Sequence, residues 1–339
     1  MPELRTDPLS GLRTIVAGER AGRPGAAFRV EPRPAIDPEG DPFLLGHEGR
    51  TPPELHAMRP DGSAPDGPGW RVRVVPNKFP ALGPAPADDA AGPSGETLGP
   101  EPPPGRGAPA LFSSRPAVGG HEVIVNGPEP VSSIGHLDPA QLGDAMEMWR
   151  ERIRHHAGAA YVHVIVNEGR EAGASLPHTH AQLFALDWVP AAVARERERF
   201  TAYHQATQGR NLLEDLLQEE VRRRERVVAI DAEAVALCPF ASRVPFQVQI
   251  VPRRPRVRFE DDGPLGAGLL HDVLGRIERL LGGMPAFNLW VRTAPSGAES
   301  FCWRIDLLPR LGQVAGLELG AGVNLNVLAP EDAAERLRG

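Results

Sequence analysis

Segments in which apolar and polar residues alternate recur along this chain, and single amphipathic helices separate them. Such alternation is typical of β-strands with one face in a core, whereas an apolar period of three to four residues is typical of helices. In the first half, strands are predicted at 13–17, 71–75, 122–126, 161–167 and 181–186. One helix is predicted between them, beginning after Asp138, a favourable N-cap, and ending near His156.

The second half has the same style. Two helices are predicted within 190–225, and an amphipathic helix is predicted at 264–282. Further strands are predicted at 246–251, 287–291, 301–308 and 323–328. Strand-rich segments separated by single helices, twice over, predict an α+β protein made of two similar halves, which we assign to residues 1–189 and 190–339. Within the first half, residues 83–111 have little to bury and are predicted to form a flexible surface insertion.

The composition limits the kind of protein that this chain can be. It has 339 residues and a formal net charge of −7, so neither nucleic acid nor an anionic membrane is expected as a partner. Lys78 is the only lysine, which excludes most lysine chemistry. Cys238 and Cys302 are far apart in sequence, which argues against a disulfide framework. Since no secretory signal and no apolar run of about 20 residues is found, we expect a soluble cytoplasmic protein.

His178, His180 and Gln182 stand two residues apart in the stretch GASLPHTHAQL (173–183). Side chains at this spacing lie on the same face of an extended segment. A neutral imidazole is nucleophilic near pH 7, and a phosphoryl-imidazole intermediate would divide one hard displacement at phosphorus into two easier ones. The glutamine amide can donate to a phosphoryl oxygen, and the preceding glycines let backbone N–H groups approach it. On the motif alone, a surface position or a fragment of a metal site remains an alternative.

The wider segment 167–182, N-x-G-x-x-x-G-A-S-L-P-H-x-H-x-Q, resembles the active-site signature of galactose-1-phosphate uridylyltransferases. These enzymes are the transferase branch of the histidine-triad superfamily, whose hydrolases carry a third histidine where this chain has Gln182. Six further blocks resemble the family in the correct order, at 3–24, 75–82, 121–130, 238–253, 301–311 and 315–338. The similarity therefore covers essentially the whole chain outside 83–111.

The resemblance implies two histidine-triad-like α+β halves, each an antiparallel sheet with packed helices, and a homodimer. It also implies the chemistry of galactose metabolism, in which UMP moves between a UDP-hexose and a hexose 1-phosphate. His180 would attack the α-phosphorus and form a covalent uridylyl-histidine. Gln182 would hold the phosphoryl oxygens, Ser175 would contact the distal phosphate, and His178 would orient His180.

Other site residues are likewise implied by their positions in the family blocks. The expected nucleotide contacts are Arg20, Arg23, Asn77, Asn167 and Gly169. Arginine pairs phosphate through two parallel hydrogen bonds, which suits this role, although the two arginines alone would read as solvated or salt-bridged side chains. Glu318 and Asn324 are the expected sugar contacts, donated across the dimer interface, with Asn324 in place of the family's glutamine.

The family's metal ligands are mostly replaced. Many members bind zinc through a CxxC pair, a later histidine and the first histidine of the signature. Asp41 and Leu44 stand at the cysteine positions and Pro130 stands at the histidine position. Only His178 remains, and one imidazole cannot hold a structural zinc ion, so we predict no metal at this site.

A second metal site of some relatives uses a glutamate and several histidines. Glu196 remains at about the right distance after the signature, but Arg292, Cys302 and Arg304 replace the histidines. We therefore predict that Arg304 pairs with Asp306 or Glu196 in place of a metal.

Two other functions stay open. One is a phosphorylase, in which inorganic phosphate resolves the nucleotidyl-histidine and the donor is ADP-glucose or a dinucleoside polyphosphate. The other is a non-catalytic relative that binds nucleotide. The joint presence of Asn167, Ser175, His180 and Gln182 argues against the non-catalytic alternative, because a site without activity does not need that set.

Overall fold

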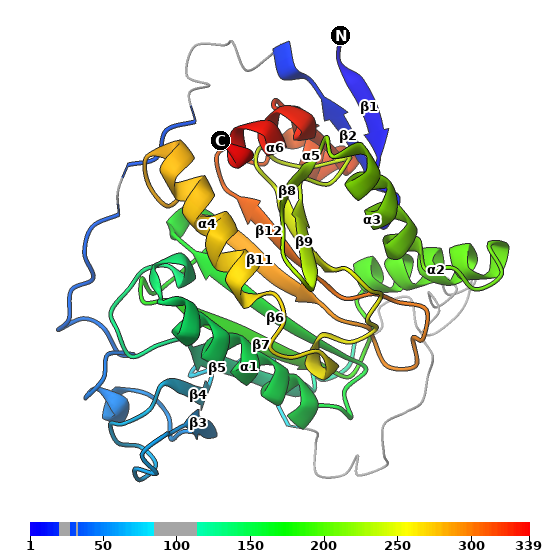
Figure 1. The fold of residues 1–339 in the computed structure, drawn as a ribbon. Helices are drawn as coiled ribbons and strands as arrows, with labels where there is room; N and C mark the ends of the chain where they lie inside the picture. Colours follow the sequence, from blue (N-terminus) through cyan, green and yellow to red (C-terminus); the bar gives the residue numbers. More distant parts are fainter. Residues whose placement is uncertain (20–27, 32, 85–113) are drawn as a thin grey trace.

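The computed structural model of the chain describes residues 1–19, 28–31, 33–84 and 114–339 (Figure 1). Two predictions fall outside these residues: the arginines Arg20 and Arg23, and nearly all of the 83–111 insertion. Within the described part of the chain, no helix has the length and apolar character needed to cross a membrane.

Ten antiparallel strands form one sheet, and each half of the chain supplies five of them. The first half supplies β3 (His56–Met58), β4 (Val72–Pro76), β5 (Gly119–Val125), β6 (Tyr161–Glu168) and β7 (His180–Leu186). The second half supplies β8 (Val227–Ile230), β9 (Ala234–Leu237), β10 (Val248–Pro252), β11 (Phe287–Arg292) and β12 (Arg304–Pro309). The strand order across the sheet is β3-β4-β5-β7-β6-β11-β12-β10-β9-β8. From either outer edge to the centre, each half places its first three strands in order, then its fifth strand and then its fourth. The two halves meet where β6 pairs with β11, for example at Ile165 and Trp290.

Two helices cover one face of this sheet (Figure 1). In each half one helix connects the third and fourth strands, α1 (Pro139–His155) in the first and α4 (Ala267–Leu281) in the second. Asp138 caps α1 by accepting hydrogen bonds from two backbone N–H groups, as predicted. Trp149 of α1 and Leu270 of α4 are fully buried in the main core with the inward side chains of β6, and burial of each such side chain stabilises the fold by about 1.5–3 kcal/mol.

The opposite face is covered at both ends and less so in the middle. Helices α2 (Ala191–Ala206) and α3 (Leu212–Arg223) pack on the second half through residues such as Phe200 and Leu217. Phe43 packs on β4 and β5. Between these covers, the outward side chains of β6, β7 and β11 stay partly exposed: His163, Ile165, Asn167, Gln182, Phe184, Asn288 and Trp290. The alternation of strand side chains thus leaves one partly open surface at the centre of the sheet.

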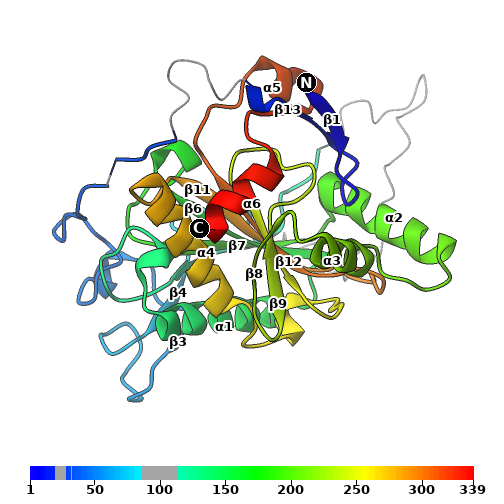
Figure 2. The same ribbon diagram turned by 45° about the horizontal axis from the view of Figure 1, so that its top comes forward.

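A small second sheet lies at one end of the molecule, beside both chain termini (Figures 1 and 2). It consists of β1 (Glu3–Thr6), β2 (Arg13–Val16) and β13 (Val323–Asn326), with β13 parallel to β2. The short helix α5 (Gly316–Ala321) precedes β13, and α6 (Pro330–Arg338) ends the chain and packs against α4 and β8.

The predicted fold class, α+β with antiparallel strands and packed helices, is confirmed. The predicted boundary at residue 190 falls one residue before α2, and the division into two domains stays a prediction because both halves share one sheet. The predicted strand at 301–308 begins later, at Arg304, because residues 301–303 adopt no regular structure.

Candidate active site

The loop between β6 and β7 holds most of the predicted site. Its Gly169 and Gly173 have φ angles of 84° and 86°, a backbone region that residues with a side chain rarely adopt. A Cβ atom at Gly169 would lie 2.6 Å from the Cβ of Ala286, so this close approach also requires glycine. Ser175 is exposed in the loop, where a ligand can reach it. The loop ends at His180, the first residue of β7.

His180 is held so that one ring nitrogen stays available. Its Nδ1 lies 2.9 Å from the backbone oxygen of His178, and because a carbonyl oxygen only accepts, Nδ1 carries the proton. Burial lowers the pKa of His180, so the ring is neutral at pH 7 and Nε2 carries a lone pair. The ring of Phe43 lies 5.2 Å away, centroid to centroid, and limits its movement. This is the protonation state that a nucleophilic imidazole requires.

His178 is fully buried, and both of its ring nitrogens face hydrogen-bond acceptors. Nδ1 lies 2.7 Å from Oδ2 of Asp41, and Nε2 lies 2.9 Å from the backbone oxygen of Gly127. Burial alone would raise the pKa of Asp41, but the hydrogen bond and charge of His178 outweigh it, so that pKa is lowered. In the sequence, Asp41 stands only at a position where the family has a metal ligand, and no local pattern links its carboxylate to His178.

These contacts do not fit a zinc ion. A histidine that donates from both ring nitrogens has no lone pair for a metal, and the carboxylate at the former cysteine position already accepts one of the two protons. In the described part of the chain, no group of three or more His, Cys, Asp or Glu residues is arranged to hold a metal.

At the second former metal position, arginines pair with buried carboxylates. Arg304 NH2 lies 3.0 Å from Oε2 of Glu196, and its Nε lies 3.0 Å from Oδ2 of Asp306. Arg292 Nε lies 3.5 Å from the same Glu196 oxygen. Both predicted partners of Arg304 are therefore confirmed, and guanidinium groups supply the positive charge beside Glu196.

The structure brings further predicted residues to the partly open face around His180. Gln182 follows His180 on the same face of β7, and Asn167 lies at the end of the adjacent strand β6, where Val166 pairs with Ala181. Asn77 follows β4, and its backbone N–H donates to the backbone oxygen of His121 at 2.9 Å. Two contacting residues were missed from sequence. His121 touches Gln182 and Asn288 touches Asn167, and their separations of 61 and 121 residues gave no local signal.

The predicted sugar contacts do not join His180 within the chain. Glu318 lies on α5 and Asn324 lies on β13, where Asn324 pairs with Thr14 of β2. This small sheet lies beside the chain termini and away from β7 (Figures 1 and 2).

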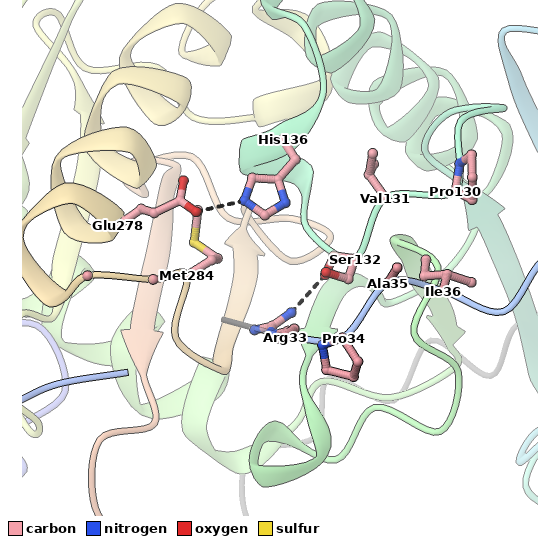
Figure 3. A pocket seen from close by; sticks show the side chains of 12 residues that line it. Arg33, Pro34, Ala35, Ile36, Pro130, Val131, Ser132, His136, Glu278 and Met284 are labelled. Carbon is pink, nitrogen blue, oxygen red and sulfur yellow. Dashed lines mark hydrogen bonds and ion pairs between the residues drawn. The ribbon is translucent and has the colours of Figure 1, made fainter. Parts of the chain in front are cut away.

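A pocket of about 340 Å³ lies between residues 33–36, the segment around Ser132 and the end of α4 (Figure 3). Arg33 lines it and donates to the backbone oxygen of Ser132 at 2.7 Å, while His136 and Glu278 form an ion pair at 2.9 Å on its other side. An NH2 nitrogen of Arg33 also lies 3.2 Å from where a Cβ of Gly169 would be. The pocket contains none of the residues around His180, so it is separate from the candidate site.

Comparison with known proteins identifies relatives along the whole chain. The family model of the galactose-1-phosphate uridyl transferase N-terminal domain matches residues 69–190, and that of a domain of unknown function, DUF4921, matches residues 134–338. An ADP-glucose phosphorylase from Arabidopsis thaliana is 30% identical over 99% of this chain and 92% of its own. A galactose-1-phosphate uridylyltransferase from Haemophilus influenzae is 27% identical over 99% of this chain and 94% of its own.

A solved structure agrees with these sequence relatives. The crystal structure of an ADP-glucose phosphorylase from Arabidopsis thaliana with bound ADP-glucose superimposes with a TM-score of 0.78. The match covers 100% of this chain and 99% of that one, at 27% identity.

Proposed function

The chain belongs to the galactose-1-phosphate uridylyltransferase family, and from this premise we propose that it transfers a nucleoside monophosphate from a nucleoside diphosphate hexose through His180. The observation that carries the proposal is the fixed state of the His180 ring. Its Nδ1–H is bound to the backbone oxygen of His178, so Nε2 presents a lone pair at the partly open face of the sheet.

The first step forms a bond between Nε2 of His180 and the α-phosphorus and breaks the bond from that phosphorus to the bridging oxygen. The leaving group is the hexose 1-phosphate. The ring becomes positively charged, and the carbonyl oxygen of His178, 2.9 Å from Nδ1, stabilises that charge. Gln182 and Asn167, on the same face of neighbouring strands, would donate from their amides to phosphoryl oxygens, and exposed Ser175 would contact the distal phosphate. In the second step a phosphate oxygen of the acceptor attacks the same phosphorus and releases His180.

The finer question is the acceptor. Phosphorolysis of ADP-glucose, with inorganic phosphate as acceptor, is supported by the 30% identity to the phosphorylase over nearly the full length. UMP transfer to a hexose 1-phosphate is supported by the family model over 69–190, the segment that carries the nucleophile. The higher identity, together with the TM-score of 0.78, moves the phosphorylase reaction ahead of the uridylyl transfer that the sequence motifs alone favoured.

We also propose that the active protein is a homodimer. Glu318 lies on α5, which leads into the small sheet, and Asn324 lies on β13 of that sheet. This sheet lies away from His180 of its own chain, so its residues are available to the site of a second copy. Mixing His180→Ala protein with Glu318→Ala protein tests this. Recovered activity supports a shared site, and an inactive mixture of two folded dimers contradicts it.

Intact mass spectrometry at neutral pH tests the covalent step. The protein is incubated with UDP-glucose, UDP-galactose or ADP-glucose, without an acceptor. An adenylyl increment supports the phosphorylase reaction, and a uridylyl increment supports transfer to a hexose 1-phosphate. The increment should disappear in His180→Ala and persist in His136→Ala, whose ring lies in the separate pocket. No increment with any donor would refute the covalent mechanism.

A further inference from the structure

His121 lies on β5 beside the strand that carries Gln182. It pairs across strands with Phe184, and the two rings stack with centroids 4.1 Å apart and an interplanar angle of 25°. Its Nδ1 accepts a hydrogen bond of 3.0 Å from the backbone N–H of Ala81, and its Nε2 lies 3.1 Å from Oε1 of Gln182. Both edges of the ring are therefore in contact with the protein.

These contacts determine the tautomer of His121. A backbone N–H can only donate, so Nδ1 carries no proton, and a neutral ring must then carry its proton on Nε2. Burial lowers the pKa of His121 more than the hydrogen bond to Gln182 raises it, so the ring is neutral at pH 7. His121 consequently donates from Nε2 to the oxygen of Gln182. The amide nitrogen of Gln182 must face away from His121, with its two N–H bonds free for another partner.

Asn77 lies beside the same ring nitrogen. Its oxygen accepts from the backbone N–H of Phe79 at 2.9 Å, so the group that lies 3.1 Å from Nε2 of His121 is its NH2 nitrogen. Because Nε2 already donates to Gln182, it cannot also accept from Asn77, so this contact brings two donor groups together.

Asn288 orients the second amide in the same way. Its nitrogen donates to the backbone oxygen of Ala172 at 2.8 Å, which determines which end of this amide is the nitrogen. The second hydrogen of that nitrogen is donated to the oxygen of Asn167, also at 2.8 Å. Asn167 pairs with Asn288 across β6 and β11, and its own NH2 group therefore faces away from Asn288. Both amide orientations are therefore determined by a backbone group: the N–H of Ala81, which can only donate, and the oxygen of Ala172, which can only accept.

We propose that His121 and Asn288 are positioning residues that turn the amides of Gln182 and Asn167 so that both present N–H groups to the phosphate attacked by His180. The inference rests on the proposed function. Phosphoryl oxygens only accept hydrogen bonds, and preorganised donors lower the barrier most where negative charge develops. Without His121 or Asn288, each amide is free to present its oxygen, which repels the phosphate.

Substitution of His121 separates orientation from packing. His121→Phe keeps a ring against Phe184 and removes the donor, whereas His121→Gln places an amide N–H near the position of Nε2. We expect His121→Phe to slow nucleotidyl-His180 formation about tenfold to hundredfold, the range typical of residues that orient a site from its outer layer. His121→Gln should recover most of this loss. Since the donors act in the transition state, kcat and kcat/KM should fall together, and Asn288→Leu should have the same signature.

The controls distinguish the possible failures. His136→Phe is the matched substitution, since His136 is an exposed histidine outside the site, and it should react at the wild-type rate. If wild-type protein forms no adduct with any donor, the proposed function fails. If wild-type protein reacts and both His121→Phe and Asn288→Leu keep its rate, the positioning roles are refuted. Equal losses in His121→Phe and His121→Gln would also refute the role of His121.

Nitrogen NMR provides a second test, because it reports the tautomer of His121 in the unaltered protein. In histidine-labelled protein, the signal absent from the His121→Gln or His136→Phe spectrum identifies each ring. We expect His121 to carry its proton on Nε2 and to have a bare Nδ1 at pH 7. A His121 protonated on Nδ1 would overturn the inference, because Nε2 could then not donate to Gln182.

Discussion

Asp41→Asn replaces one oxygen of the buried carboxylate that pairs with His178, the histidine two residues before His180. The carboxylate is 1% exposed and the ring is 0% exposed, at a distance of 2.7 Å. With a neutral amide at position 41, the ring loses its counter-ion while Nε2 still faces the oxygen of Gly127. The ring must then either remain charged without a buried partner or lose one of its two hydrogen bonds.

The structure sets the size of the effect. Removal of one partner from a buried pair costs about 3–5 kcal/mol, because the remaining charge is left uncompensated. For a chain of this length, at about 2 °C per kcal/mol, the melting temperature should fall by about 6–10 °C. The backbone oxygen of His178 accepts the Nδ1 proton of His180, so a looser His178 should also slow formation of the nucleotidyl-histidine.

Calorimetry and urea unfolding across a pH series provide the assay. The pKa of Asp41 is lowered in the folded state, so its stabilisation is present above the ordinary value of 3.8 and is lost as the pH falls through the folded-state pKa. The difference between wild type and Asp41→Asn should therefore shrink as the pH falls below about 3.8. Glu278→Gln is the matched control, since its pair with His136 is about one-third exposed and is worth about 0–1 kcal/mol. An Asp41→Asn protein as stable and as active as wild type would refute the reasoning.

Three further changes have defined outcomes. Gly169→Ala should lower the free energy of unfolding by about 1–3 kcal/mol and reduce activity, because its Cβ would lie 2.6 Å from Ala286; urea unfolding and an adduct assay measure both. Arg304→Met should cost about 3–5 kcal/mol because buried Asp306 loses its guanidinium partner, and a smaller loss in the Arg304→Met/Asp306→Asn double variant would confirm the coupling. The pKa of Glu122 falls to about 2, so its contribution of about 3 kcal/mol should disappear between about pH 4.5 and 2 in wild type and be absent at all pH values in Glu122→Gln.

The fold was predictable where one face of an element is buried. The strand at 161–167 and the helix from Asp138 show their periods in the sequence because one side contacts the core and the other does not. Strand β9 was missed because all four of its residues, Ala234–Leu237, are apolar as well as buried, so its sequence shows no alternation of polar and apolar residues. Strand β3 has only three residues, which is too short for any period to be read.

In the candidate site, the residues expected to contact the substrate were predictable from the sequence, but the residues that hold them in place were not. The spacing of His180 and Gln182 is local, so one strand places both on the same face. The residues that determine their protonation and orientation come from distant segments: Asp41 from a loop 137 residues before His178, and His121 from another strand. Such contacts depend on the tertiary structure, and a single sequence contains no pattern for them.

The two halves of the sheet have equivalent positions that now differ in chemistry. Ile165 pairs with Gln182 in the first half, Trp290 pairs with Asp306 in the second, and Ile165 and Trp290 pair with each other at the junction. Gln182 and Asp306 therefore occupy matching places on β7 and β12.

By the same spacing, the first residues of these strands, His180 and Arg304, also match. In the first half this position carries a neutral ring with a free lone pair. In the second half it carries a guanidinium whose two carboxylate partners are fully buried with it, so no ligand can displace them without leaving charges unpaired. Of these two equivalent positions, the one in the first half thus carries a potential nucleophile, whereas the arginine in the second half stabilises the sheet.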